Sequence, residues 1–218
     1  DKAPGIDNMS SEYYARSGVI GHSMLTTIIN KCLSKGDIPD DWKTGQIFPI
    51  LKQGSSSVLS NYRPITLLKS IWKLLMIIIK RRLMAVVEVI DIFGHLQAGF
   101  RRGHSTIELG RALIDSIEDS TQHRKPLSIC FVDIAKAYDT VPHQAIWQSL
   151  RRIGAPDNFI LFLKNAYKGA ISTVLPAFGP TDSFTVDNGV RQGCPQSPLL
   201  FIIFLQPLLR SIERHNLG

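Results

Sequence analysis

A carboxylate follows an apolar segment in the second half of this 218-residue chain. Residues 128–133 are mostly apolar and partly β-branched, a pattern that predicts a buried strand ending at Asp133. Because an unpaired carboxylate is costly to bury, such an aspartate needs a partner, and a divalent metal ion is one candidate. An aspartate in this position also commonly serves as a turn or cap residue. The segment therefore predicts either a metal ligand or a local structural role for Asp133.

Two longer motifs around this position resemble a known family. Residues 131–139, FVDIAKAYD, are similar to motif A of the reverse transcriptases of non-LTR (LINE-type) retrotransposons, which has the form FxDxxKAFD. Residues 188–201, NGVRQGCPQSPLLF, resemble motif B of the same family, with Gln196 where the family usually has Leu. Further similar motifs open the chain and recur at residues 61–68 and 97–106. The motifs follow the family's order, and the resemblance covers nearly the whole chain.

The resemblance implies an α/β (α+β) fold, namely the fingers and partial palm of a right-hand polymerase, with helices packed on a small, mainly antiparallel sheet. Residues 1–125 would form a fingers-like region with some palm helices. Residues 126–218 would form a partial palm with motifs A and B. Motif C, a YADD hairpin with the remaining catalytic aspartates, does not occur in the sequence. We therefore expect one reverse transcriptase domain, truncated at its C-terminal end, that does not polymerise DNA by itself.

The resemblance also implies a function, RNA-directed DNA polymerisation with an RNA template, a DNA primer and deoxynucleoside triphosphates. Such enzymes use two-metal chemistry, with Mg²⁺ or Mn²⁺ as the cofactor. The catalytic residue and metal ligand would be Asp133, joined by the main-chain carbonyl of Ile134. Tyr138 would crowd the 2′ carbon of the incoming sugar and reject ribonucleotides, and Asp139 is predicted to cap a helix rather than bind metal. The alternative function is a catalytically inactive nucleic-acid-binding remnant.

Four further residues are expected to contact the nucleotide. Lys52 and Arg63 flank a Gly/Ser-rich turn between two short extended segments, so a β-hairpin would bring them together. The resemblance implies that these cations lie over the incoming triphosphate and neutralise its charge; two exposed surface cations are the alternative. Gln192 and Gly193 lie in the turn of motif B, and the resemblance implies that they contact the nucleotide.

The positive charge of the chain is concentrated in one segment. The net charge is +7, and residues 41–111 hold eleven Lys/Arg against four Asp/Glu, which accounts for the whole excess. A solvated basic surface is one interpretation, and a polyanionic partner such as nucleic acid is the other. Within this segment, Arg101 and Arg102 lie between Gly99 and Gly103 and suit phosphate groups, so we expect both to bind nucleic acid.

Hydrophobic periodicity and turn residues predict the elements that would position these side chains. The predicted helices span residues 19–34, 66–90, 105–122, 157–168 and 199–215, with one more from a cap at Asp139 or Thr140 to Arg152. Gly36 is predicted to end the first of them, and Ser105 to cap the third. The predicted strands span residues 46–52, 128–133, 171–175 and 184–186.

Composition excludes several other classes of protein. The apolar content of 44% is ordinary for a globular protein with a core. The three cysteines lie far apart, match no disulfide or zinc spacing, and suit a reducing compartment. The longest apolar runs are too short to span a bilayer, so we expect no membrane association. We expect an intracellular location, in the nucleus, the cytoplasm or both.

Overall fold

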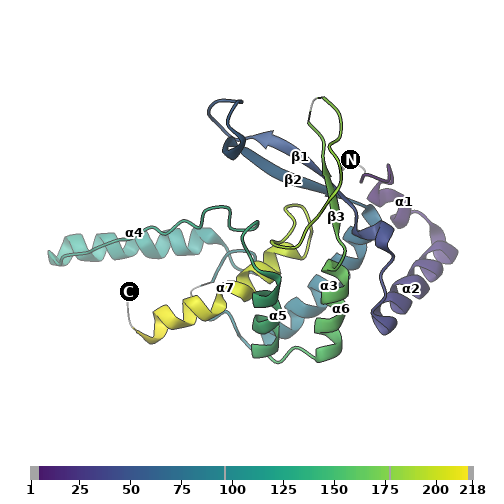
Figure 1. The fold of residues 1–218 in the computed structure, drawn as a ribbon. Helices are drawn as coiled ribbons and strands as arrows, with labels where there is room; N and C mark the ends of the chain where they lie inside the picture. The colour runs from purple at the N-terminus through teal and green to yellow at the C-terminus, as the bar shows by residue number, and fades with distance from the viewer. Residues whose placement is uncertain (1–4, 96, 177, 216–218) are drawn as a thin grey trace.

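The computed structural model describes residues 5–95, 97–176 and 178–215 (Figure 1). Its sheet contains β1 (Gly45–Leu51), β2 (Tyr62–Leu68), β3 (Ile171–Val174) and β4 (Phe184–Thr185), in the order β2-β1-β3-β4. β1 pairs with β2, and β3 with β4, in antiparallel fashion, whereas β1 and β3 are parallel. The mixed α/β (α+β) fold class and the small, mainly antiparallel sheet are therefore confirmed.

The remaining regular elements are helices. In the described residues they are α1 (Ser11–Ala15), α2 (Gly18–Lys35), α3 (Ser70–Val89), α4 (Thr106–His123), α5 (His143–Arg152), α6 (Asp157–Tyr167) and α7 (Ser197–Arg214), together with the short 3-10 helices η1 (Asp40–Lys43) and η2 (Leu59–Asn61). In Figure 1, α3, α5, α6 and α7 lie together beneath the sheet, while α4 extends away from them.

Three helix ends follow the predicted signals. Gly36 adopts a left-handed φ of +67°, and its N–H donates to the carbonyl of Cys32 at 2.9 Å, which closes α2. The Ser105 hydroxyl accepts a hydrogen bond from the amide of Ile107 at 3.2 Å and begins α4. α7 carries Pro198 in its first turn, where a helix does not need the missing N–H.

One apolar core joins the two halves of the chain. Leu75 and Met76 on α3 are fully buried in the same cluster as Leu199 and Leu200 on α7. Burying one such side chain contributes about 1.5–3 kcal/mol, so this cluster is a large part of the driving force for folding. Because β1 and β3 also pair, the two predicted regions share both a sheet and a core. The boundary between them, near residue 125, stays a prediction.

The predicted strand over residues 128–133 is wrong. This segment has no regular secondary structure, and Phe131 and Val132 are 83% and 85% exposed. A strand requires a neighbour for its backbone N–H and C=O groups, and in the described residues this segment has none. Cys130, which lies in the strand that was predicted to be buried, is exposed for that reason, whereas Cys32 and Cys194 are buried.

Two other predictions about helix starts are also corrected. α5 begins at His143, with Pro142 rather than Asp139 or Thr140 at the N-cap, and no side chain caps it. The helix predicted from residue 66 begins at Ser70, because residues 66–68 pair with β1 instead. In both places, tertiary contacts decide the boundary that local propensity left open.

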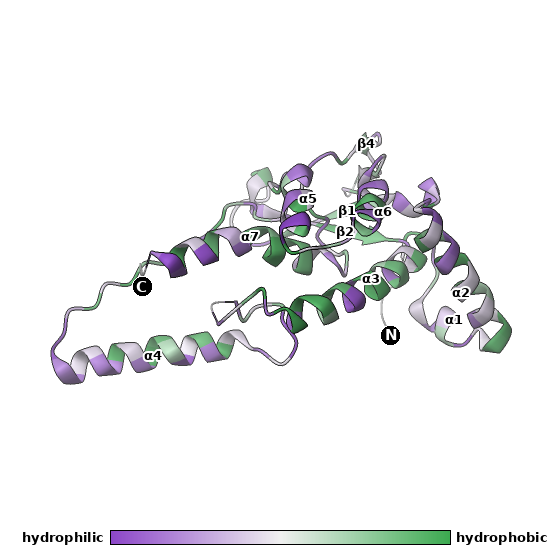
Figure 2. Cartoon of the chain, turned by 90° about the horizontal axis from the view of Figure 1, so that it is seen from below, coloured by the Kyte–Doolittle hydropathy of each residue, from purple (hydrophilic) through white to green (hydrophobic). Residues whose placement is uncertain are grey.

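α4 packs little of its surface against the rest of the chain. None of its residues is buried, and its exposed apolar side chains include Ile107, Ile114 and Ile117. Figure 2 shows the helix standing apart from the other helices, with hydrophobic and hydrophilic residues along its length. No helix in the described ranges is long and apolar enough to cross a bilayer.

Candidate functional site

The predicted β-hairpin is present and carries both cations. In the antiparallel register of β1 and β2, Arg63 lies opposite Ile50, and the amide of Lys52 donates to the carbonyl of Asn61 at 2.8 Å. Since residues two apart along a strand point to the same face, Lys52 and Arg63 share one face of the hairpin. Both side chains are exposed. The hairpin therefore presents two cations together, as predicted.

Motif A forms a turn rather than the end of a strand. Lys136 adopts a left-handed φ of +50°, and its carbonyl accepts hydrogen bonds from the amides of Asp139 and Thr140 at 2.9 and 3.2 Å. Asp133 and Ile134 precede this turn and are exposed. The structure thus places the predicted catalytic carboxylate in solvent, on an irregular segment.

Tyr138 turns inward from the same segment. Its ring lies 5.2 Å from the ring of Phe201 on α7, at an interplanar angle of 49°. Partial burial raises the pKa of the Tyr138 hydroxyl above its usual value. The aromatic ring is thus held against the core at the base of motif A, beside the carboxylate segment.

Motif B contacts motif A through the backbone. The amide of Val190 donates to the carbonyl of Tyr138 at 2.7 Å, and the amide of Gly189 donates to the carbonyl of Val141 at 2.8 Å. Gly189 has a φ of +79°, and a Cβ built there would lie 2.7 Å from the Tyr138 carbonyl oxygen. Only glycine allows this approach of two backbones. The two motifs, about fifty residues apart in sequence, are therefore joined directly.

The same loop contacts the hairpin on its other side. The amide of Thr66 on β2 donates to the carbonyl of Gln192 at 2.6 Å, so the loop pairs with the outer edge of the sheet. Gly193 also lies against Thr66. Motif B thus bridges Tyr138 of motif A and the hairpin that carries Lys52 and Arg63. The sequence predicted each of these pieces, and the structure shows that the motif B loop links them.

His143, the first residue of α5, supports the junction at which the motif B loop meets motif A and the hairpin. Its Nε2 donates to the Gly189 carbonyl at 2.8 Å, and its ring lies 4.9 Å from the ring of Tyr167 at 79°. Burial lowers the pKa of His143, although the bond to Gly189 opposes this shift. Burial also raises the pKa of Tyr167 far above its usual value and raises that of the Cys194 thiol. These groups are therefore neutral supports of the loop.

The two arginines predicted to bind nucleic acid differ in their surroundings. The Arg101 guanidinium donates to Glu88 at 2.8 Å and to the Gly94 carbonyl at 2.6 Å, and it lies 5.3 Å from the centre of the Phe93 ring. Its side chain is only 6% exposed. Arg101 is thus engaged in contacts within the protein, and its predicted role in nucleic-acid binding stays a prediction. Arg102 is exposed, and its role stays a prediction.

Sequence reasoning missed three residues that build this junction: Thr66, Gly189 and His143. Gly189 lies in an Asn-Gly pair, a turn signal that could have indicated its left-handed backbone. Thr66 and His143 carried no such signal, because their roles depend on partners more than forty residues away. These contacts follow from the tertiary fold rather than from local pattern.

A profile of one protein family matches residues 50–217, more than half of the chain. The family is described as reverse transcriptase (RNA-dependent DNA polymerase). This chain belongs to the reverse transcriptase family. The matched range contains the hairpin cations, motif A and motif B.

Relatives of this reverse transcriptase domain come from retrotransposons. It is 29% identical over 212 residues to the retrovirus-related Pol polyprotein from type-1 retrotransposable element R2 of Popillia japonica, covering 97% of this chain and 29% of the relative. It is 28% identical over 207 residues to the RNA-directed DNA polymerase from mobile element jockey of Drosophila funebris, covering 93% and 22%. These names confirm the predicted non-LTR type. The chain spans less than a third of the length of either relative.

Reverse transcriptases generally depend on divalent metal ions, which need donor atoms near the catalytic carboxylate. Mg²⁺ takes oxygen ligands, commonly one or two carboxylates with phosphates and water. Asp133 supplies one exposed carboxylate, and no group of three His, Cys, Asp or Glu residues suited to a metal occurs in the described part of this reverse transcriptase domain. These residues do not form a metal site by themselves.

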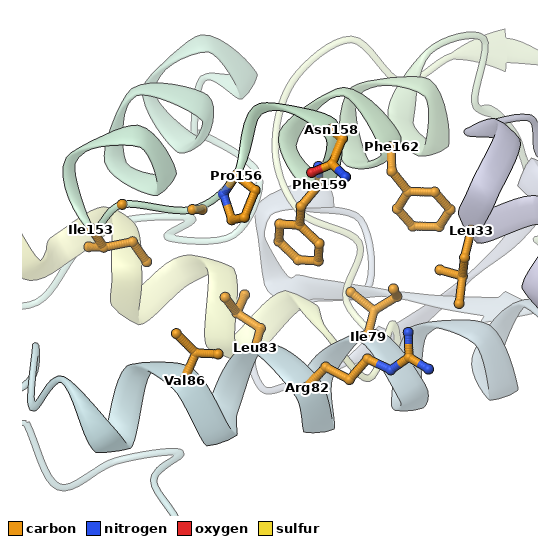
Figure 3. Close-up of a pocket in the computed structure, with 12 residues that line it drawn as sticks. Leu33, Ile79, Arg82, Leu83, Val86, Ile153, Pro156, Asn158, Phe159 and Phe162 are labelled. Carbon is orange, nitrogen blue, oxygen red and sulfur yellow. The ribbon is translucent and has the colours of Figure 1, made fainter.

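An apolar pocket of this reverse transcriptase domain lies away from the junction (Figure 3). It has a volume of about 260 Å³ and is lined by residues of α2, α3, α6 and the turn before α6. Phe159 and Phe162 point into it from one side, and Ile79 and Leu83 from the other. None of the predicted site residues lines it.

Proposed function

We propose that this domain carries out RNA-directed DNA synthesis in the protein to which it belongs, transferring deoxynucleotides onto a DNA primer along an RNA template. The observation that carries the proposal is the bridge formed by the motif B loop. It brings together Tyr138 and the cationic hairpin in a chain of the reverse transcriptase family. Nucleotide transfer requires a sugar site, phosphate-binding cations and a catalytic carboxylate close together.

Each predicted nucleotide contact has a physical role in this proposal. Lys52 and Arg63 on the hairpin would bind the β and γ phosphates, which carry the negative charge. Gln192 and Gly193 would contact the nucleotide from the loop, and Tyr138 would exclude a 2′-hydroxyl. The divalent ion would be Mg²⁺ or Mn²⁺, and Asp133, with the Ile134 carbonyl, would contribute to its ligands. When bound, such an ion would supply electrostatic stabilisation of the transferred phosphate.

Exposed basic residues support the binding of nucleic acid. On α3, Arg81 and Arg82 are exposed, and the hairpin and Arg102 add further cations. By contrast, Lys43, Lys69 and Arg101 form ion pairs with acidic residues. Within residues 41–111, the exposed cations thus include Lys52 and Arg63 on the hairpin, Arg81 and Arg82 on α3, and Arg102 between Gly99 and Gly103. A template–primer duplex, with its dense negative charge, is the partner that they suit.

The experiment is primer extension on an RNA template, with the complete reading frame that contains this chain. Asp133→Asn removes the carboxylate charge with little change in shape, and we expect it to abolish extension while template–primer affinity stays within about twofold. Asp182→Asn, on an exposed loop, is the matched control and should extend normally. Template–primer binding by the wild type without extension would instead indicate a nucleic-acid-binding protein that lacks catalysis.

A further inference from the structure

Arg191 is a buried cation inside the motif B loop. The residue is 8% exposed, and its Nη2 donates to the main-chain carbonyl of Lys43. Its guanidinium lies 5.8 Å from the centre of the Trp72 ring. Nη1 is buried without a hydrogen-bond partner in the described residues, and no described carboxylate pairs with the group. Burial lowers the pKa of Arg191.

This arrangement is unfavourable for stability alone. A buried charge needs an opposite charge or full hydrogen bonding to offset the loss of water, and Arg191 has one carbonyl and one aromatic face. An apolar side chain of similar length would avoid that cost. Arginine, however, offers a planar group that stacks on an indole while its edge donates a hydrogen bond. Its contribution therefore lies in where it holds the loop.

The two partners of Arg191 lie on the elements next to the hairpin. Lys43 is the last residue of η1, and only Thr44 separates it from β1. Trp72 is in the first turn of α3, which follows β2. The next residue in the loop, Gln192, is the one whose carbonyl accepts the Thr66 amide. The guanidinium and this backbone bond thus hold consecutive residues of the loop against the base of the hairpin, where β1 begins and β2 ends.

We propose that Arg191 is a positioning residue, which holds the motif B loop against the base of the hairpin so that Gln192 and Gly193 stay beside Thr66 and the incoming nucleotide. The nucleotide part of this inference rests on the proposed polymerase function. The loop part does not, because the contacts with Lys43, Trp72 and Thr66 are present without substrate. Losing the guanidinium should therefore loosen the loop and weaken nucleotide binding.

The test compares Arg191→Met, which keeps length and removes charge, with Arg191→Lys and with Arg214→Met on the exposed end of α7. In the complete protein, Arg191→Met should raise KM for the deoxynucleotide about tenfold, with a smaller change in kcat. Its melting temperature should stay within about 2 °C of the wild type or rise, because a buried charge is removed. The KM of Arg191→Lys should lie between those of Arg191→Met and the wild type. Arg214→Met should leave KM, kcat and the melting temperature unchanged.

Hydrogen exchange provides a measurement that does not depend on activity. The Thr66 amide should exchange faster in Arg191→Met than in the wild type, since its acceptor Gln192 is no longer held. An unchanged exchange rate in the peptide containing Thr66 would overturn the positioning role. A higher KM that is fully explained by a smaller fraction of folded protein would also overturn it. If the wild type fails to extend primers, the polymerase proposal fails, and the exchange result still decides whether Arg191 places the loop.

Discussion

Gly193 lies so close to Thr66 that a Cβ atom built on it would be 2.4 Å from the Thr66 carbonyl oxygen. Its φ of +122° is also one that side chains rarely adopt. Gly193→Ala should therefore push the motif B loop away from β2. We expect a loss of about 2–4 kcal/mol in the free energy of unfolding, from strain and overpacking together. Urea denaturation measures this loss, and primer extension should fall with it.

Gly169→Ala is the matched control for this substitution. Gly169 also has a left-handed φ, +67°, but nothing lies within 4 Å of a Cβ built there. This variant should lose only the conformational cost, about 1 kcal/mol. Equal losses in the two variants would show that the contact with Thr66 is not what demands glycine at position 193.

Tyr138 should determine the choice between deoxyribose and ribose. Removing its ring with Tyr138→Ala opens the space beside the 2′ carbon, so the preference for deoxynucleotides should fall by about tenfold or more. Tyr138→Phe keeps the ring packed on Phe201 and should keep the preference. The measurement is kcat/KM for matched ribo- and deoxynucleotides. An unchanged ratio in Tyr138→Ala would mean that this ring serves the core alone.

Arg101 and Arg102 should separate stability from nucleic-acid binding. Arg101→Ala removes hydrogen bonds to Glu88 and Gly94, and we expect it to cost about 2 kcal/mol of unfolding free energy. Arg102→Ala should leave stability unchanged, weaken template–primer binding and reduce the slope of log affinity against log salt by about one. Each variant is the control for the other. A reduced salt slope in Arg101→Ala alone would reverse the two assignments.

His143 should make stability depend on pH. Burial lowers its pKa, whereas in the unfolded chain it titrates near its ordinary value of about 6.5. As pH falls below about 6.5, the unfolded chain takes up a proton that the folded chain resists, so stability is lost on acidification. Of the charged neighbours, Asp187 opposes this shift and Arg191 reinforces it, while Tyr167 stays neutral.

His143→Phe keeps an aromatic ring beside Tyr167 but cannot titrate. The difference in unfolding free energy between wild type and this variant should therefore change between about pH 8 and about pH 5, in the direction that penalises the wild type at low pH. Urea denaturation across this range gives both curves. Parallel curves would show that His143 titrates alike in the folded and unfolded chains.

Elements whose signals are local could be predicted from the sequence. Gly36 and Ser105 mark helix ends through their own backbone or side chain, and the hairpin around residues 53–61 follows from its turn composition. The segment at residues 128–133 was predicted wrongly because a strand depends on a neighbour that no local pattern reveals. Its apolar composition shows that the segment could be buried. Whether it forms a buried strand depends on a neighbouring strand with which its backbone can pair.

The candidate site shows the same division. Lys52 and Arg63 could be placed together from the hairpin alone. The ion pair of Arg101 with Glu88 could not be predicted, because it depends on how the segment after α3 folds back against the last turn of that helix. The sequence did not indicate the burial of Arg191 either, since an arginine is ordinarily exposed. Contacts between distant segments were the part that sequence could not supply.

α4 has a consequence for the cooperativity of unfolding. Since it buries no side chain, its stability comes from the Ser105 cap, from helix propensity and from pairs such as Arg111 with Asp115. A helix of this length is marginal in water without tertiary support, and its helix–coil transition is gradual. On heating, far-ultraviolet circular dichroism should therefore decline before the fluorescence of the buried Trp72 and Trp147 changes. The two probes would then report separate transitions, and one melting temperature would not describe the whole chain.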